Sequence, residues 1–227
     1  MTKLKEAYVT EKTLAARTRR WQRLLRPHLS GNRSREFVLK PDSSALLVID
    51  MQRFFLDRKS HAHLPAANAI VSNVQELLAT YRHREQPVVF TRHALLRDED
   101  AGIMGRWWGD VPRDGDQLAE IIPALQPLPG ELVLRKTRYS PFVGTEFDAM
   151  LRACGARQLV VTGVMTHLCC ECAARDAFMR DYEVFIVFDA TATQCEELHI
   201  ASLRTLSDGF AMPVTTAEVL RCLHREK

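Results

Sequence analysis

Short apolar runs alternate along this chain with stretches in which apolar residues recur every three or four positions. Five runs have the length and character of buried β-strands, at 45–50, 87–91, 131–135, 159–161 and 183–188. The intervening segments with helical spacing lie at 65–85, 117–125, 145–154, from 167 onward, 196–208 and 216–223. Strands that alternate with helices predict an α/β protein, a parallel sheet covered by helices on both faces. In such sheets the ligand lies beyond the carboxyl ends of the strands.

The stretch 92–116 breaks this alternation. It has no apolar periodicity and gathers glycine, proline and the pair Trp107 and Trp108. A loop of this length usually serves a site or an interface. The two tryptophans therefore either form the wall of a substrate pocket or anchor the loop.

The first 40 residues differ from the rest in charge. They hold eleven Lys/Arg and three Asp/Glu, a net charge of +8, which leaves −5 for residues 41–227. We therefore divide the chain into a basic arm at 1–40 and one domain at 41–227. Residues 10–26 read as an amphipathic helix that packs on the domain or on a neighbouring subunit, and residues 30–34 read as a loop. The arm lacks a basic groove with aromatic residues, so we expect it to be solvated and not to bind nucleic acid.

The composition is that of an ordinary globular protein with a single core. The chain has 227 residues, of which 46% are hydrophobic and 26% charged. Neither an apolar run of membrane-spanning length nor a secretory segment occurs, so we expect a cytoplasmic protein without a membrane partner. Six cysteines lie in the last third without regular spacing, which predicts reduced thiols. The Cys169-x-x-Cys172 motif lacks a second ligand pair, so we expect no metal and no cofactor.

Three polar groups mark the carboxyl ends of predicted strands, and parallel topology brings such ends to one edge. Asp50 ends the first strand, Lys136 ends the third, and Cys169 follows the fourth. Thr166 is a good N-cap, which puts Cys169 in the first turn of the next helix. There the helix dipole and unpaired N–H groups favour the thiolate, the nucleophilic form of cysteine.

These groups together are suited to nucleophilic acyl transfer. Asp50 can take the thiol proton and return it to a leaving group, Lys136 can hold the charges, and N–H groups at Met165 and the helix start can bind an oxyanion. Each residue alone has a structural explanation: Asp50 capping a turn, Lys136 reaching solvent and Cys169 filling space. One shared site explains all three at once. Cys170 and Cys172 point elsewhere and read as packing residues.

The chain from about 44 to 220 resembles the isochorismatase-like cysteine hydrolases, which include nicotinamidases, N-carbamoylsarcosine amidases and isochorismatases. The resemblance rests on three motifs in the family's order: Leu-Leu-Val-Ile-Asp50-Met-Gln52, Arg-Lys136-x-x-Tyr-Ser-x-Phe142 and Thr-Gly-Val-Met-Thr-x-x-Cys169-x-x-x-x-Ala-Arg-Asp-Ala177. It implies a three-layer α/β/α sandwich with a six-stranded, mainly parallel sheet. It also implies an Asp50–Lys136–Cys169 triad, a cis peptide between Val164 and Met165, and an oxyanion hole formed by the amides of Met165 and Cys169.

The resemblance also bears on the substrate. The family's nicotinamidases bind a metal through Asp-x-His after the second strand, whereas this chain reads Phe90-Thr-Arg-His-Ala there. True isochorismatases share Arg-Tyr-Ser-Pro-Phe but typically carry glycine at the position of Cys169. The retained thiol favours covalent hydrolysis of a C–N bond in a small molecule. The alternatives are an isochorismatase-type vinyl ether hydrolase and a non-catalytic binding or assembly module.

The remaining site candidates are the residues expected to contact substrate: Gln52, Phe55, Trp107, Trp108, Tyr139, Phe142 and His167. We also expect the protein to form a homo-oligomer, either a dimer or a tetramer.

Overall fold

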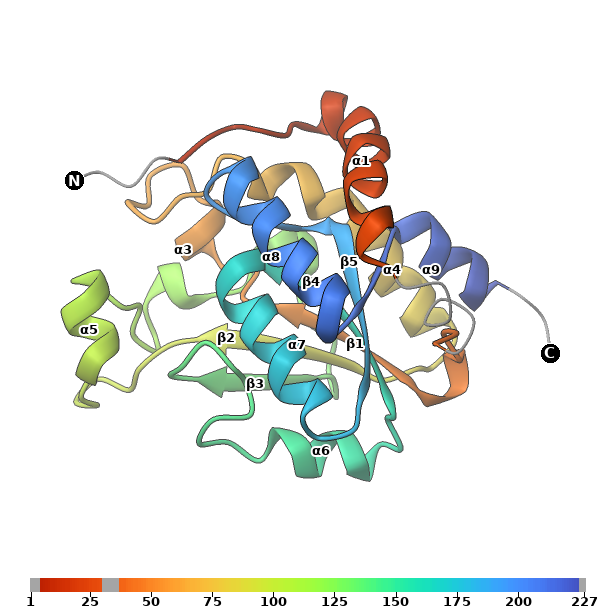
Figure 1. Ribbon diagram of the computed structural model, residues 1–227. Coiled ribbons are helices and arrows are strands. Elements are labelled where there is room, and N and C mark those ends of the chain that lie inside the picture. Colours follow the sequence, from red (N-terminus) through yellow and green to blue (C-terminus); the bar gives the residue numbers. More distant parts are fainter. Residues whose placement is uncertain (1–4, 30–36, 225–227) are drawn as a thin grey trace.

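A six-stranded parallel sheet forms the centre of the computed structural model, which describes residues 5–29 and 37–224 (Figure 1). The strand order is β3-β2-β1-β4-β5-β6, and every neighbouring pair is parallel. The strands are β1 Ser44–Ile49, β2 Val88–His93, β3 Leu132–Lys136, β4 Gln158–Val164, β5 Glu183–Ala192 and β6 Met212–Val214. The five predicted strands are confirmed. Strand β6 was missed because it has three half-buried residues and contains a proline at the sheet's edge.

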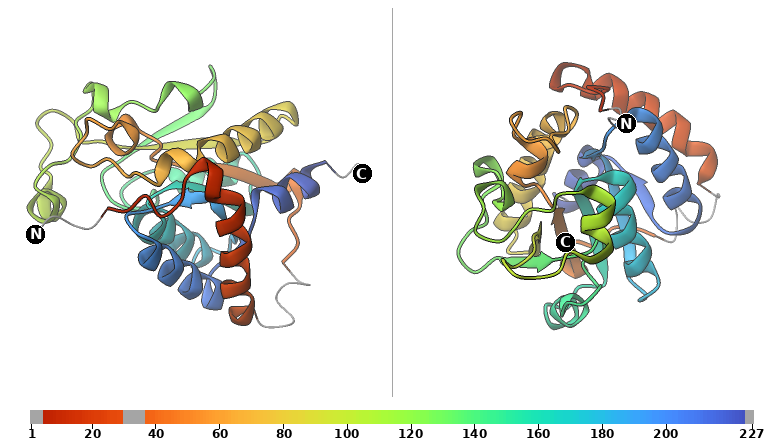
Figure 2. Two further views of the ribbon diagram at one scale, coloured as in Figure 1. Left: turned by 90° about the horizontal axis from the view of Figure 1, so that it is seen from above. Right: turned by 90° about the vertical axis from the view of Figure 1, so that its left-hand side faces the viewer.

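Helices cover both faces of the sheet, which confirms the three-layer sandwich (Figure 2). The longer helices are α1 Glu11–Leu25, α4 Val71–His83, α6 Phe147–Ala153, α7 Glu171–Phe178, α8 Glu196–Gly209 and α9 Thr216–Leu223. Helices α4 and α9 contact each other on one face, and α7 and α8 contact each other on the opposite face. No helix in the part of the chain that the structure describes is long and apolar enough to cross a membrane.

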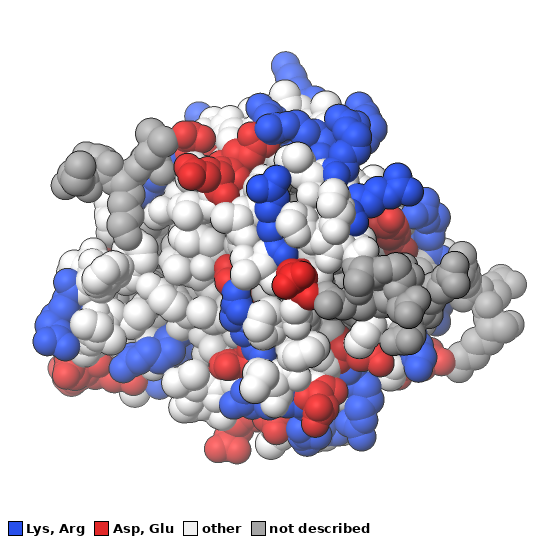
Figure 3. All heavy atoms as spheres, in the orientation of Figure 1, with Lys and Arg blue, Asp and Glu red and all other residues white. Residues whose placement is uncertain are grey.

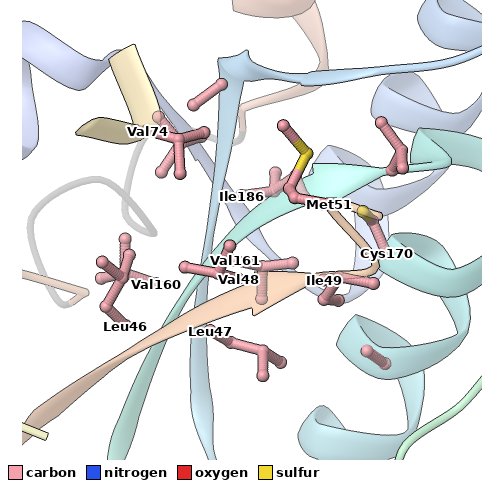
Figure 4. Packing of buried hydrophobic residues seen from close by; sticks show 14 of the residues in the cluster. Leu46, Leu47, Val48, Ile49, Met51, Val74, Val160, Val161, Cys170 and Ile186 are labelled. Carbon is pink, nitrogen blue, oxygen red and sulfur yellow. The ribbon is translucent and has the colours of Figure 1, made fainter. Parts of the chain in front are cut away.

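The core lies around the two central strands. Every residue of β1 and β4 is buried, as a parallel strand covered on both faces requires (Figure 4). Gly163 allows the two strands to approach closely: its φ is +104°, and a Cβ built there would lie 2.1 Å from the backbone oxygen of Ile49. The carboxyl ends of β1 and β4 are therefore held in contact.

The secondary structure predicted for two segments is wrong, for local reasons. The stretch 92–116 is not loop throughout, because α5, Gly102–Trp108, forms a short helix within it. The predicted helix at 117–125 is two separate 3-10 turns, Gln117–Ala119 and Pro123–Leu125, because the ring of Pro123 has no N–H with which to continue a helix. The predicted loop at 30–34 lies outside the described residues.

The N-terminal arm packs on its own domain through the predicted amphipathic helix. Helix α1 buries Leu14, Trp21 and Leu25, contacts α8, and places its arginines outward, where Lys and Arg gather at the top of Figure 3. The indole Nε1 of Trp21 donates a hydrogen bond to Glu196 at 2.8 Å. The expectation of a solvated arm therefore fails for the apolar face of α1, because Trp21 is fully buried.

Candidate active site

Asp50, Lys136 and Cys169 meet at the carboxyl edge of the sheet. The Nζ atom of Lys136 lies 2.7 Å from Oδ2 of Asp50 and 3.4 Å from Sγ of Cys169. All three side chains are buried, with exposed fractions of 0%, 1% and 5% for Asp50, Lys136 and Cys169. Asp50 lies 86 positions before Lys136 in the sequence, and Cys169 lies 33 positions after it. The three residues form one cluster because their strands end at the same edge of the sheet.

Asp50 is fixed by its neighbour on β2. Its φ is +48°, in the left-handed region, so the chain turns sharply just after β1. The hydroxyl of Thr91 donates to Oδ1 of Asp50 at 2.6 Å and accepts the backbone N–H of Asp50 at 3.2 Å. Thr91 was not predicted as a site residue. Its only signal was a polar side chain near the end of an otherwise apolar strand.

Lys136 uses its ammonium group to join three partners. Besides Asp50 and Cys169, Nζ donates to the carbonyl oxygen of Arg138 at 3.1 Å. Burial opposes the lysine's charge, but the negative charge of Asp50 and the hydrogen bonds to Asp50 and Cys169 outweigh it and raise the pKa of the ammonium. Lys136 is therefore a permanent cation within the cluster.

Cys169 lies in the first helical turn after β4, as predicted. That turn is a π-helix over Thr166–Cys170, which continues into α7, and its N-cap is Met165 and not the predicted Thr166. The hydroxyl of Thr166 instead pairs with Nδ1 of His199 at 2.9 Å. The peptide bond between Val164 and Met165 is cis, as the resemblance implied.

The resting thiol is neutral, which corrects the expectation of a thiolate. Complete burial raises the pKa of Cys169 above its ordinary value, and the carboxylate of Asp50 raises it further, against the opposing effect of Lys136. The positive charge of Lys136 is already balanced by Asp50. At rest, the cluster is thus an ion pair beside a protonated thiol.

Cys169 opens onto a cavity of about 430 Å³. Five predicted substrate or oxyanion residues line this cavity together with Cys169: Phe55, Trp107, Trp108, Tyr139 and Met165. The indole Nε1 of Trp108 donates to the hydroxyl of Tyr139 at 2.7 Å, which joins the α5 segment to the loop after β3. The tryptophan loop therefore forms part of the cavity wall.

Three predicted substrate residues are not among those that line this cavity. Gln52 is buried, and its side chain bonds both the N–H and the carbonyl of His93, at 2.8 and 3.1 Å. Phe142 packs against Phe147, with ring centroids 4.7 Å apart. His167 directs Nδ1 to the hydroxyl of Thr193. Each side chain is engaged by a structural partner.

Other lining residues were not predicted, notably Lys5, Phe54 and His93. His93 ends β2, and burial, together with the positive charge of Lys136, lowers the pKa of its imidazole to about 4. His93 is thus neutral near pH 7. Within the described ranges, no three His, Cys, Asp or Glu side chains gather as metal ligands would. The metal-free site stays a prediction.

The fold and this edge cluster fit an α/β hydrolase, and comparisons with known proteins identify the family. Residues 44–218 match the family model described as "Isochorismatase domain". The chain therefore belongs to the isochorismatase family of hydrolases. This membership confirms the expectation of an enzyme over that of a non-catalytic module.

Named relatives span two chemistries. The chain is 41% identical to "Nicotinamidase 3" of Arabidopsis thaliana over 184 residues, 79% of this chain and 88% of that protein. It is 31% identical to a "Probable isochorismatase" of Pseudomonas chlororaphis, over 82% of this chain and 88% of that protein. A solved structure of a cysteine hydrolase from Pseudomonas syringae pv. phaseolicola superposes with a TM-score of 0.79 at 29% identity, covering 82% of this chain and 95% of that one.

Proposed function

We propose that this protein hydrolyses the C–N bond of a small amide through a covalent thioester at Cys169. The observation that carries the proposal is the contact of Lys136 Nζ with both Sγ of Cys169 and the carboxylate of Asp50, beside a cavity that Cys169 itself lines. A nucleophile, a proton acceptor and a fixed cation are the parts that acyl transfer needs.

The first half-reaction forms the thioester. Because the resting thiol is neutral, Asp50 takes its proton as Sγ bonds to the carbonyl carbon of the substrate. The amides of Met165 and Cys169 hold the oxyanion that forms. When the oxyanion collapses, the C–N bond breaks, and the proton on Asp50 passes to the leaving nitrogen. Lys136 keeps its charge throughout and stabilises the carboxylate and the developing thiolate.

The second half-reaction releases the product. Water attacks the thioester carbonyl and gives a proton to Asp50. Collapse of the second oxyanion breaks the C–S bond, and Asp50 returns the proton to Sγ. The products are a carboxylic acid and ammonia or an amine, and the enzyme returns to its resting state.

The cavity supports a small, flat substrate. Its volume of about 430 Å³ is near the lower end of the range for ligand pockets, about 300–1,000 Å³. Aromatic side chains form much of its wall, among them Phe54, Phe55, Trp108 and Tyr139. Together with the similarity to "Nicotinamidase 3", this makes aromatic carboxamides the substrate class to test first, with nicotinamide as the neutral probe.

The test is detection of the thioester. Incubation with an aromatic amide should release ammonia, and rapid quenching should show the acyl mass on the peptide that contains Cys169. Hydroxylamine should divert the acyl group to a hydroxamate. If ammonia is released but no Cys169 adduct or hydroxamate forms, the covalent mechanism is wrong.

The second candidate is isochorismatase chemistry, favoured by the similarity to the Pseudomonas chlororaphis protein. In that mechanism Asp50 protonates a vinyl ether and water attacks the resulting cation, so no thiol is needed. Cys169→Gly should then preserve turnover of isochorismate while Asp50→Asn stops it. Under the amidase mechanism both substitutions abolish amide hydrolysis.

A further inference from the structure

The N-terminal arm reaches the catalytic cavity, although it lies outside the residues 44–218 that match the family. The segment before α1 runs along the loop that follows β5. There the N–H of Glu6 donates to the carbonyl of Gln194 at 2.7 Å, and the N–H of Thr193 donates to the hydroxyl of Tyr8 at 3.0 Å. Gln194 and Lys5 both line the cavity. The arm therefore forms part of the cavity wall.

Lys5 occupies a defined place in that wall. Its Nζ donates a hydrogen bond to the carbonyl oxygen of His61, which also lines the cavity. Three residues further on, Tyr8 is buried, with its ring centroid 5.7 Å from that of His199 and 6.1 Å from that of Trp21. These anchors fix the backbone of the arm, so the ammonium of Lys5 is held at the cavity and is not on a freely moving tail.

The charges around the cavity give this ammonium a special position. Among the described residues that line the cavity, the acidic and basic side chains (Asp, Glu, Lys or Arg) are those of Lys5 and Asp110. Oδ2 of Asp110 lies 3.6 Å from Nε2 of His61. Lys136 does not line the cavity and is paired with Asp50. Of the lining residues that the structure describes, Lys5 is thus the permanent cation that an anionic group on a bound molecule can meet.

Lys5 differs from Lys136 in its electrostatic surroundings. Burial lowers the pKa of its ammonium, whereas the carboxylate of Asp50 helps to raise the pKa of Lys136. Cys169 and the partly desolvated ammonium of Lys5 thus line the same cavity. A partly desolvated cation gains more from an anionic partner than an exposed one does.

We propose that Lys5 is a specificity-determining residue whose ammonium binds a carboxylate at the end of the substrate remote from the scissile amide. The inference deepens the proposed function and rests on it. It assigns the preferred substrate to the class of flat amides that carry a second, anionic group, and nicotinamide lacks that group.

The test compares two amides that differ in this group. The probes are benzamide and 4-carbamoylbenzoate, and the variants are Lys5→Met, Lys5→Arg and, as a matched control, Lys12→Met on the exposed face of α1. We expect Lys5→Met to raise the KM for 4-carbamoylbenzoate about tenfold, the loss of one charge-assisted hydrogen bond, with little change in kcat. The KM for benzamide should change much less, because benzamide carries no anionic group for Lys5 to bind.

The two control variants sharpen this result. Lys5→Arg should keep the preference for the carboxylate, and Lys12→Met should match the parent with both amides. Equal effects of Lys5→Met on the two amides, or no effect on either, would overturn the proposal.

Binding to Cys169→Ala separates this inference from the proposed function. Calorimetry should show tighter binding of 4-carbamoylbenzoate than of benzamide, and Lys5→Met in the same background should remove the difference. If the parent enzyme hydrolyses neither amide but this difference in Kd is found, the amidase proposal fails and the role of Lys5 stands. If 4-carbamoylbenzoate binds no better than benzamide while Lys5 is present, the role of Lys5 is refuted.

Discussion

The carboxyl edge of the sheet and the N-terminal arm both contribute residues to the wall of the same cavity, but they are built in different ways. At the sheet edge, buried strands end in Asp50 and Lys136, and the backbone topology itself brings these side chains together. The described residues of the arm, 5–29 and 37–40, add no strand to the sheet, and the arm reaches the cavity through side-chain anchors, chiefly Tyr8 and Trp21. The comparison suggests that the edge carries the chemistry, while the arm adjusts what the cavity accepts.

His199 connects the two regions. Its ring packs against Trp21 of α1, with centroids 4.6 Å apart, and its Nδ1 pairs with the hydroxyl of Thr166, which begins the segment that carries Cys169. Thr193 makes a second connection, because its N–H bonds Tyr8 and its hydroxyl bonds His167. Substitutions in the arm should therefore change kcat through the segment that carries Cys169, but by less than substitutions at the sheet edge itself.

The largest expected effect is at the nucleophile. Cys169→Ala should lower kcat for amide hydrolysis by at least about 1,000-fold, because covalent catalysis loses its attacking atom. The variant should unfold at nearly the same temperature as the parent. Cys170→Ala is the matched control, since Cys170 is fully buried and directs its Sγ to the carbonyl of Thr162 at 3.9 Å. Equal loss of kcat in both folded variants would mean that Cys169 is not the nucleophile.

Next in size is the support of Asp50. Thr91→Val removes the hydroxyl that donates to Oδ1 of Asp50, and we expect kcat to fall about 10- to 100-fold with KM nearly unchanged. Thr91→Ser should restore most of kcat because it keeps the hydroxyl. The control is Thr162→Val, which removes a buried hydroxyl that bonds the carbonyl of Leu47. A fall in kcat of the same size in Thr162→Val would show that the Thr91 effect is one of general packing.

The sequence predicted the residues at the sheet edge far better than it predicted Thr91, which supports Asp50, or the contacts of the N-terminal arm. Asp50, Lys136 and Cys169 each follow an apolar run that can be recognised locally, and one topological rule then brings the three together. The roles of Thr91 and Lys5 depend on contacts with residues 41 and 56 positions away, which no local pattern encodes. The side chains of Gln52 and His167, predicted to contact substrate, are bonded to His93 and Thr193, and no local pattern encodes these contacts either.

A third prediction concerns the pH dependence of stability at the connection between the two regions. Burial lowers the pKa of His199 to about 3, below the value of about 6.5 in an unfolded chain. Between these pH values the unfolded state binds one more proton than the folded state. The contribution of His199 to the free energy of unfolding should therefore fall by about 1.4 kcal/mol for each pH unit as the pH drops below about 6.5.

Denaturant unfolding at several pH values between 4 and 7.5 tests this slope. His199→Asn should be less stable than the parent at pH 7.5, and the difference should shrink as the pH falls, because the variant has no imidazole to protonate. A stability difference that is constant over this range would contradict a buried neutral His199.

The smallest expected effect is in the arm, and it tests whether the arm reaches the nucleophile at all. Tyr8→Phe removes the hydroxyl that accepts the N–H of Thr193, and Thr193 in turn bonds His167, two residues before Cys169. We expect kcat to fall about two- to fivefold, since the loss of one neutral hydrogen bond costs about 1 kcal/mol and acts here through two intermediate residues.

The control is Tyr182→Phe, which removes a hydroxyl hydrogen bond to Asp148. If Tyr8→Phe and Tyr182→Phe lower stability equally and only Tyr8→Phe lowers kcat, the arm positions the nucleophile segment. If neither changes kcat, the arm influences the cavity wall alone.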